Sequence, residues 1–298
     1  MSLSSAVVAV LAASAVSYYY HSGKKLTLEE STVTTTSRDV TATTTTSEDD
    51  PNSNRLKRWQ DRWSTGRTQW HKTEIHASLQ KYCDEYLIDG IIGGGGRILV
   101  PLCGKTVDMV YLARKRIISE VVGIDAVPKA MDEFIQEQSN EGLDFKEPET
   151  TANGFTKRRG ESITLITGDF FDISLDVING DASNTSVFDG VWDRASLVAI
   201  DPSLREQYID KIGELILKPN GKYLLSTFLR PNNDTTSGPP FSLDETEIRR
   251  LFGAKSWVDT ITLLDSHSYL ALEPWYKVVS TYFRMGNIKE EIYIITTK

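Results

Sequence analysis

The chain has 298 residues and a mass of 33.4 kDa, and its 40% hydrophobic and 25% charged residues are ordinary globular proportions. These values exclude a wholly disordered, collagen-like, coiled-coil or multi-span membrane protein. Acidic residues outnumber basic ones by 41 to 33, and this excess argues against a nucleic-acid partner. Cys83 and Cys103 occur without a C-x-x-C motif or a Cys/His cluster, so neither a disulfide scaffold nor a metal site is expected.

Residues 1–25 form an apolar segment that differs in composition from the rest of the chain. No charged side chain precedes Lys24 and Lys25, and residues 6–16 are apolar except for Ser14. This length fits a signal-peptide core and is shorter than the roughly 20 residues that span a bilayer. The positive charges follow the apolar core, an arrangement that would keep the next domain in the cytosol. We predict targeting to an organelle or a membrane tether at residues 1–25, with a disordered apolar end as the alternative.

Residues 26–54 are rich in threonine, serine and acidic residues and contain little that a core could bury. Such a composition cannot offset the entropy lost on ordering, so a flexible tether is predicted here. The remaining residues, 55–298, are predicted to form one domain of cytoplasmic type.

The elements of this domain alternate along the chain. Helical spacing of apolar residues predicts helices at 55–63, 75–87, 106–115, 127–138, 204–217 and 244–252. Short apolar runs predict strands at 97–100, 120–125, 163–167, 187–192, 222–229, 261–264, 278–283 and 288–296. Residues 139–161 are expected to be an irregular polar insertion, and Ser242 with Glu245 to form a capping box. The alternation predicts a parallel, doubly wound α/β sheet with an antiparallel end.

Ligands of such sheets bind where the strands end, so the loops that follow the strands are the candidate site. Gly104 lies in the turn after the first strand, and Asp125 ends the second strand 21 positions later. A glycine turn followed by an acid at this spacing is typical of a nucleotide-ribose site. A single glycine in place of G-x-G-x-x-G favours a nucleoside without phosphates, such as S-adenosylmethionine, over a dinucleotide. A purely structural turn is the alternative.

Two further strand ends carry polar residues. Asp169 and Phe170 follow the third strand, where an acid can accept the adenine amino group while an aromatic ring stacks on the base. A polar loop with core phenylalanines is equally compatible with this pattern. Asp193 and Arg194 follow the fourth strand, either as an ion pair that holds the loop or as a group that steers a cofactor carboxylate or an anionic acceptor.

Six motifs lie along the predicted domain: WQDRWSTGRTQWH at 59–71, ILVPLCGKTVDM at 98–109, VVGID at 121–125, GDFFD at 168–172, FDGVWDRASLVAIDP at 188–202 and GPPF at 238–241. Their order and spacing resemble the thiopurine S-methyltransferase family, from about Trp59 to the C-terminus. The resemblance implies a Rossmann-like, mostly parallel seven-stranded sheet with an antiparallel C-terminal end and helices on both faces. It also implies S-adenosylmethionine as the cofactor.

The resemblance assigns a role to each matching position. It implies cofactor contacts for Trp59, Trp63, Leu102, Gly104, Asp125, Asp169, Phe170 and Arg194, and acceptor contacts for Trp70 and Arg194. Plain core packing is the alternative for the tryptophans. Arg194 and Asp193 are the catalytic candidates: Arg194 would favour an anionic acceptor, and Asp193 would orient Arg194 or serve as a base. Relatives often carry phenylalanine at position 70, so the acceptor pocket is expected to be narrowed or flattened here.

The expected reaction is methyl transfer to a small soft nucleophile, most simply a thiol, with halide, sulfide and selenium species as alternatives. An activated sulfonium methyl requires alignment and exclusion of water rather than a covalent enzyme intermediate. His71 is a candidate for helping a proton leave, whereas His76 and His267 are expected on the surface. An NAD-type oxidoreductase and a non-catalytic cofactor-binding protein are the alternatives from other classes. We expect a monomer that acts on small molecules and binds no nucleic acid.

Overall fold

The computed structural model describes residues 51–298 apart from residues 152, 181–182, 185, 217–218, 231–232, 234–237 and 269–287. The predicted targeting segment at 1–25, residues 26–50 of the predicted tether and the predicted strand at 278–283 lie outside the described residues. Helix α2 (Pro51–Ser64) takes in residues 51–54 of the predicted tether. Within the described part, no helix has both the length and the apolar character needed to cross a membrane.

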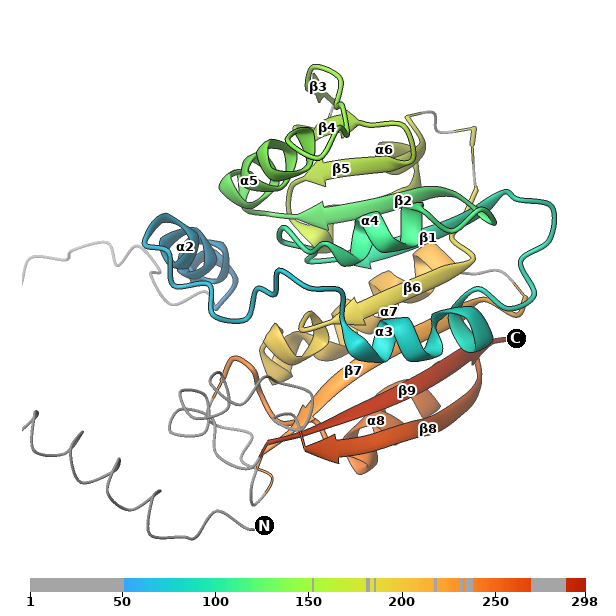
Figure 1. Cartoon of the computed structure of the whole chain (residues 1–298). Helices are drawn as coiled ribbons and strands as arrows, with labels where there is room; N and C mark the ends of the chain where they lie inside the picture. The colour runs from blue at the N-terminus through green and yellow to red at the C-terminus, as the bar shows by residue number, and fades with distance from the viewer. Residues whose placement is uncertain are drawn as a thin grey trace, which may run out of the picture. The chain divides into compact units, whose positions relative to one another are not determined.

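Nine strands of the described chain form one sheet in the order β3-β4-β5-β2-β1-β6-β7-β9-β8 (Figure 1). They are β1 (Gly96–Pro101), β2 (Ile118–Asp125), β3 (Glu149–Thr150), β4 (Thr156–Arg159), β5 (Ile163–Thr167), β6 (Gly190–Arg194), β7 (Lys222–Leu229), β8 (Val258–Ser268) and β9 (Lys289–Thr297). The five central strands from β5 to β7 pair in parallel, and the outer strands join antiparallel. The predicted doubly wound α/β class with an antiparallel C-terminal end is confirmed.

Helices cover both faces of this sheet (Figure 1). They are α2, α3 (Ala77–Tyr82), the π-helical turn η1 (Cys83–Leu87), α4 (Asp108–Ala113), α5 (Pro128–Ser139), α6 (Leu175–Asn179), α7 (Arg205–Ile216) and α8 (Glu245–Gly253), with 3-10 turns η2 (Phe170–Asp172), η3 (Leu197–Ala199) and η4 (Pro202–Leu204). Side chains of α3, α4 and α5 pack on one face with Ile98 and Val100 of β1, and those of α6, α7 and α8 pack on the other face with Leu99. The alternation along β1 therefore divides the core into two apolar layers.

The insertion at residues 139–161 differs from its prediction. It contributes the hairpin β3–β4, and β4 pairs antiparallel with β5, so the sheet has nine strands rather than seven. The four residues of β4 read TKRR and carry no apolar alternation. Lys157 is nevertheless buried, and its Nζ donates to the Ile178 carbonyl at 2.7 Å. Main-chain pairing to an existing edge, rather than apolar side chains, holds this strand in place.

The start of α8 also differs from its prediction. The N-cap is Asp244, whose carboxylate accepts from the backbone N–H of Glu247 at 2.8 Å. Ser242 instead accepts from the Arg230 backbone N–H at 3.1 Å. The predicted capping box of Ser242 and Glu245 was therefore wrong by two residues, because Asp244 offers an equally good cap next to the same helix.

Candidate active site

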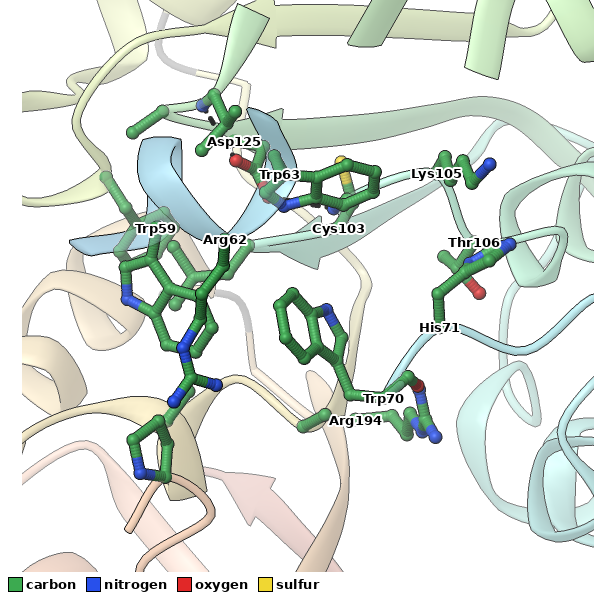
Figure 2. A pocket seen from close by; sticks show the side chains of 18 of the residues that line it. Trp59, Arg62, Trp63, Trp70, His71, Cys103, Lys105, Thr106, Asp125 and Arg194 are labelled. Carbon is green, nitrogen blue, oxygen red and sulfur yellow. Dashed lines mark hydrogen bonds between the residues drawn. The ribbon is translucent and has the colours of Figure 1, made fainter. Parts of the chain in front are cut away.

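A cavity of about 280 Å³ lies at the carboxyl edge of the parallel strands (Figure 2). Its walls come from the ends of β1, β2 and β6, from the loops that follow them and follow β5, and from α2 with the segment after it. The structure brings together at this cavity Trp59, Trp63, Trp70, Leu102, Gly104, Asp125, Asp169, Phe170 and Arg194. All the predicted cofactor- and acceptor-contact residues therefore share one cavity, as the convergence of parallel strand ends requires.

The backbone is left-handed at the two strand ends that flank the cavity. Leu102, which follows β1, has a φ of 44°, and Ala195, which follows β6, has a φ of 64°. Such angles are uncommon in residues other than glycine and collect at binding sites. Between them, Gly104 has a φ of 53°, and a Cβ at this position would lie 3.2 Å from the Trp63 ring. Glycine suits this position because its φ is positive and because a side chain would crowd the Trp63 ring of α2.

Asp125 ends β2 with its carboxylate buried at the cavity wall. One oxygen accepts from the Gly104 backbone N–H at 2.8 Å, and the other accepts from that of Val127 at 2.8 Å. Burial raises the pKa of Asp125 to about 6, although these backbone donors act in the opposite direction. The carboxylate bridges the turn after β1 and the start of α5, and its remaining lone pairs stay available to a ligand.

Asp169 is tied to α2 as well as to its own loop. Its carboxylate accepts from the Phe171 backbone N–H at 3.1 Å and forms an ion pair with Arg55 at 2.5 Å. The Arg55 guanidinium lies 4.6 Å from the centre of the Phe171 ring. Phe170 is fully buried and stacks obliquely on Tyr208 at 5.1 Å between ring centres. The loop after β5 is therefore held to α2 on one side and to the core on the other.

The three tryptophans form a contiguous aromatic wall. Trp70 meets Trp59 edge-to-face at 5.3 Å and Trp63 at 6.3 Å between ring centres. Trp63 is 4% exposed and packs with Val127, while the Arg62 guanidinium lies over the rings of Trp59 and Trp70. The two interpretations of these residues are therefore compatible, because the rings pack together and also line the cavity.

Arg194, the last residue of β6, reaches the segment that follows α2. Its guanidinium donates to the Trp70 carbonyl at 2.8 Å, and its buried Nε has no hydrogen-bond partner in the described residues. A buried donor without a partner costs free energy unless a ligand satisfies it. Figure 2 shows Arg194 beside Trp70 at the cavity.

Asp193 does not accompany Arg194. Its side chain is fully buried, accepts from the hydroxyls of Tyr208 and Tyr223 at 2.6 Å each, and accepts from the Leu197 backbone N–H at 3.1 Å. Neighbouring residues of a strand point to opposite faces, so the Asp193 carboxylate lies away from the cavity. The prediction that Asp193 acts as a base or orients Arg194 is corrected, and its carboxylate instead fixes the loop after β6.

Asp108 is a polar residue of the cavity that the sequence analysis did not single out. Asp108, at the start of α4, accepts from the Trp192 indole N–H at 2.9 Å and from the His76 backbone N–H at 2.8 Å. His76 and His267 were predicted on the surface, but His76 is 3% exposed and both rings lie 3.2–3.3 Å from the Glu290 carboxylate. The PLCGKTVDM and VWDR motifs contained Asp108 and Trp192, whereas no local spacing pointed to Glu290.

The fold is a Rossmann-like α/β sheet with a cavity at the carboxyl ends of its parallel strands. Magnesium protoporphyrin IX methyltransferase from Synechocystis, solved with bound SAH, has the same fold with a TM-score of 0.51 and 14% identity. The alignment covers 82% of the present chain and all of that one.

The sequence comparisons give the family. The profile of the thiopurine S-methyltransferase family matches residues 54–296. The thiopurine S-methyltransferase of Nitrosospira multiformis is 30% identical over 240 residues, which cover 80% of this chain and 97% of that protein. The rat enzyme is 30% identical over 245 residues, with 82% and 92% covered. The chain belongs to the thiopurine S-methyltransferase family and is an S-adenosylmethionine-dependent methyltransferase.

Proposed function

We propose that this protein transfers the methyl group of S-adenosylmethionine to the sulfur of a small thiol that reacts as its anion. The observation that carries this proposal is the state of Arg194, a cation at the cavity whose partners among the described residues include no carboxylate and whose Nε has no acceptor. A negatively charged group of the acceptor, or of the cofactor, would form an ion pair with this guanidinium and accept a hydrogen bond from it.

Two other cations at the cavity, Lys105 and Arg55, are paired with carboxylates, while a third, Arg62, lies over the rings of Trp59 and Trp70. Lys105 is neutralised by Glu133 at 2.9 Å and Glu137 at 2.6 Å, and Arg55 is neutralised by Asp169. The field that a bound acceptor would experience from Arg194 is therefore not cancelled by an adjacent carboxylate of the described chain. Such a field favours a thiolate over a neutral thiol.

The residues at the cavity fit S-adenosylmethionine. The turn at Gly104 lies at the cavity beside the Trp63 ring, the Asp125 carboxylate suits two ribose hydroxyls, and the tryptophan wall suits a sulfonium cation. Trp59, Trp63, Leu102, Asp169 and Phe170 would complete the cofactor contacts. Bound S-adenosylmethionine supplies an activated methyl group, so the protein's task is to align the acceptor and to exclude water.

A role for the Asp169 carboxylate in adenine binding must take its ion pair with Arg55 into account. Because Arg55 already pairs with it, an adenine amino group would have to share this carboxylate with the guanidinium or displace it. Two oxygens with about four lone-pair sites permit sharing. The contact of α2 with this loop and the binding of an adenine amino group would thus depend on the same carboxylate.

The direct test is methyl transfer by the full chain from labelled S-adenosylmethionine to a panel of alkyl thiols, aryl thiols, thiopurines, hydrosulfide and halides. We expect thiols to be methylated, and Arg194→Met to abolish most of the turnover. Arg97→Met is the matched control, because that arginine lies on β1 and does not line the cavity. Preference for halides over every thiol would replace the thiol by a halide acceptor, and no transfer to any acceptor would overturn the proposal.

A further inference from the structure

His71 lies at the cavity, in a segment that the fold positions firmly. Its backbone N–H donates to the Thr68 carbonyl at 2.9 Å, and the carbonyl of the preceding Trp70 accepts from Arg194 at 2.8 Å. Figure 2 shows His71 on the same side of the cavity as Thr106 and Arg194, with Trp59 on the other side. The imidazole is therefore held on the wall to which Arg194 belongs.

The ring of His71 differs from the other described histidine rings. His76 and His267 are both engaged by Glu290, whereas the described residues give the His71 ring no hydrogen bond and no ion pair. The residue lines the cavity and is half-buried, so its side chain keeps a route to solvent. A ring nitrogen without a partner on a cavity wall is free to exchange a proton with a bound molecule.

Burial, with a smaller contribution from nearby cations, favours the neutral imidazole of His71. Burial lowers its pKa below the ordinary value, and the nearby cations Lys105 and Arg194 lower the pKa further. Glu137 and Glu133 act in the opposite direction without reversing the shift. A neutral imidazole has one ring nitrogen that accepts a proton, as a general base requires.

We propose that His71 is the general base that accepts the proton of a neutral thiol acceptor, an inference that rests on the proposed function. The S–H bond breaks as a ring nitrogen of His71 takes the proton. The thiolate sulfur then bonds to the methyl carbon as the bond between this carbon and the sulfonium sulfur breaks, and that electron pair stays on the cofactor sulfur. Arg194 stabilises the thiolate between these events, and the imidazolium later loses its proton to water.

The carboxylates at the cavity are less suited to this role, because each is already committed. Asp108 accepts from Trp192 and from the His76 backbone, and Asp125 accepts from two backbone N–H groups. Asp169 is paired with Arg55. Unlike these three carboxylates, the His71 ring has a basic nitrogen to which the described residues give no hydrogen-bond or ion-pair partner.

The test compares two acceptors in the full chain and in His71→Asn. One is an alkyl thiol that is mostly protonated at the assay pH, and the other is an aryl thiol that is already ionised. We expect His71→Asn to lower kcat for the alkyl thiol by about 100-fold, the usual contribution of a general base, and to change kcat for the aryl thiol by less than about threefold. Equal losses for both acceptors, or no loss for either, would overturn the assignment of a base.

Two readouts separate a base from a structural residue. The kcat of the unaltered protein with the alkyl thiol should fall as the pH drops through the pKa of His71, and this acidic limb should disappear in His71→Asn. An NMR titration of the full chain, with the His71 signal assigned from the variant, should show a neutral ring where turnover is maximal. A protonated ring there would overturn the inference alone, whereas failure of the unaltered protein to methylate either thiol would overturn the proposed function and the inference together.

Discussion

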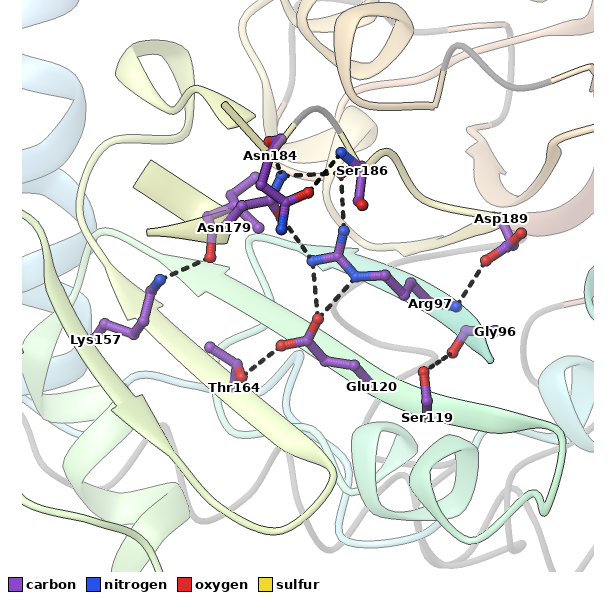
Figure 3. A network of polar contacts seen from close by, with 11 residues as sticks. Gly96, Arg97, Ser119, Glu120, Lys157, Thr164, Asn179, Asn184, Ser186 and Asp189 are labelled. Atoms are coloured by element: carbon purple, nitrogen blue, oxygen red, sulfur yellow. Dashed lines mark hydrogen bonds and ion pairs between the residues drawn. The ribbon is translucent and has the colours of Figure 1, made fainter. Parts of the chain in front are cut away.

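Two arginines at opposite ends of neighbouring parallel strands have very different surroundings. Arg97, near the start of β1, donates to Glu120 at 2.8 Å, to the Ser186 carbonyl at 2.8 Å and to the Asn179 side chain at 3.0 Å (Figure 3). Arg194, at the end of β6, donates to one backbone carbonyl and leaves Nε without a partner in the described chain. Side-chain and main-chain acceptors surround the first guanidinium, while the second faces a cavity.

The same contrast holds for two carboxylates of β2. Glu120, near its amino end, pairs with Arg97 and accepts from the Thr164 hydroxyl at 2.8 Å (Figure 3). Asp125, at its carboxyl end, is buried against backbone N–H groups with a raised pKa. At the amino edge Arg97 and Glu120 pair with each other, whereas at the carboxyl edge Arg194 and Asp125 have no oppositely charged partner among the described residues. We propose that the first pair stabilises the fold and that the second pair binds the cofactor and the acceptor.

The largest expected effect is that of Arg194→Met on catalysis. Removing a cation that stabilises the anionic acceptor should lower kcat/KM by about 100-fold or more, while the fold remains intact because this arginine contributes one hydrogen bond to the described structure. Steady-state kinetics and circular dichroism of the full chain measure the two quantities. Retention of kcat/KM within about threefold would remove Arg194 from the mechanism and erase the contrast between the two edges.

Arg97→Met should show the reverse pattern. It removes an ion pair and two further hydrogen bonds from a side chain that is 15% exposed, so we expect a loss of about 2 kcal/mol in the free energy of unfolding. The kcat and KM of the folded fraction should stay unchanged, since Arg97 does not line the cavity. Urea denaturation supplies the stability, and a drop in kcat without a drop in stability would contradict the structural role.

Asp125→Asn tests the contrast between Glu120 and Asp125, the two carboxylates at opposite ends of β2. The Asp125 pKa of about 6 lies above its ordinary value of 3.8, so this group favours the folded state most below 3.8, and that contribution is lost as the pH rises through about 6. The ionised, buried carboxylate then costs about 3 kcal/mol of stability at pH 7. Asparagine removes this cost but leaves one backbone N–H without its acceptor, and the net change in unfolding free energy should be within about 1–2 kcal/mol.

The same substitution should strongly weaken cofactor binding, because the amide has one accepting oxygen in place of two and its NH2 group only donates. For the unaltered protein, affinity should fall as Asp125 becomes protonated, by about tenfold at pH 5 relative to pH 8. Calorimetry with S-adenosylmethionine or its demethylated product measures both effects. An affinity that is independent of pH between 5 and 8 would contradict the ribose role, while Glu120→Gln serves as the matched control at the other end of β2.

The sequence predicted most of the residues that line the cavity at the carboxyl edge, but few of the buried polar contacts elsewhere in the sheet. Gly104, Asp125, Asp169 and Arg194 were identifiable because parallel strand ends converge whatever their side chains are. Asp193 was misassigned because the strand was expected to end at Trp192, which placed both charges in a loop, where alternation does not apply. In the structure β6 continues to Arg194, so the two side chains point to opposite faces.

Long-range pairs escaped prediction for a different reason. His76 and Glu290 are far apart in sequence, and their proximity follows from β9 inserting beside β7. No local periodicity encodes that contact, so a histidine that looked exposed is buried. The β4 strand was missed because its stability comes from pairing with β5 rather than from its own side chains.

Trp70→Phe should have the smallest effect and tests how much of the carboxyl edge depends on side-chain shape. The hydrogen bond to Arg194 uses the Trp70 carbonyl, so the substitution preserves it, while the edge-to-face contacts with Trp59 and Trp63 become smaller. We expect KM for bulky thiols to change by about two- to fivefold as the cavity widens, with kcat nearly unchanged and less than about 1.5 kcal/mol lost in stability. A large fall in kcat would instead mean that the indole itself aligns the acceptor, and the aromatic wall would then belong to the catalytic machinery together with Arg194.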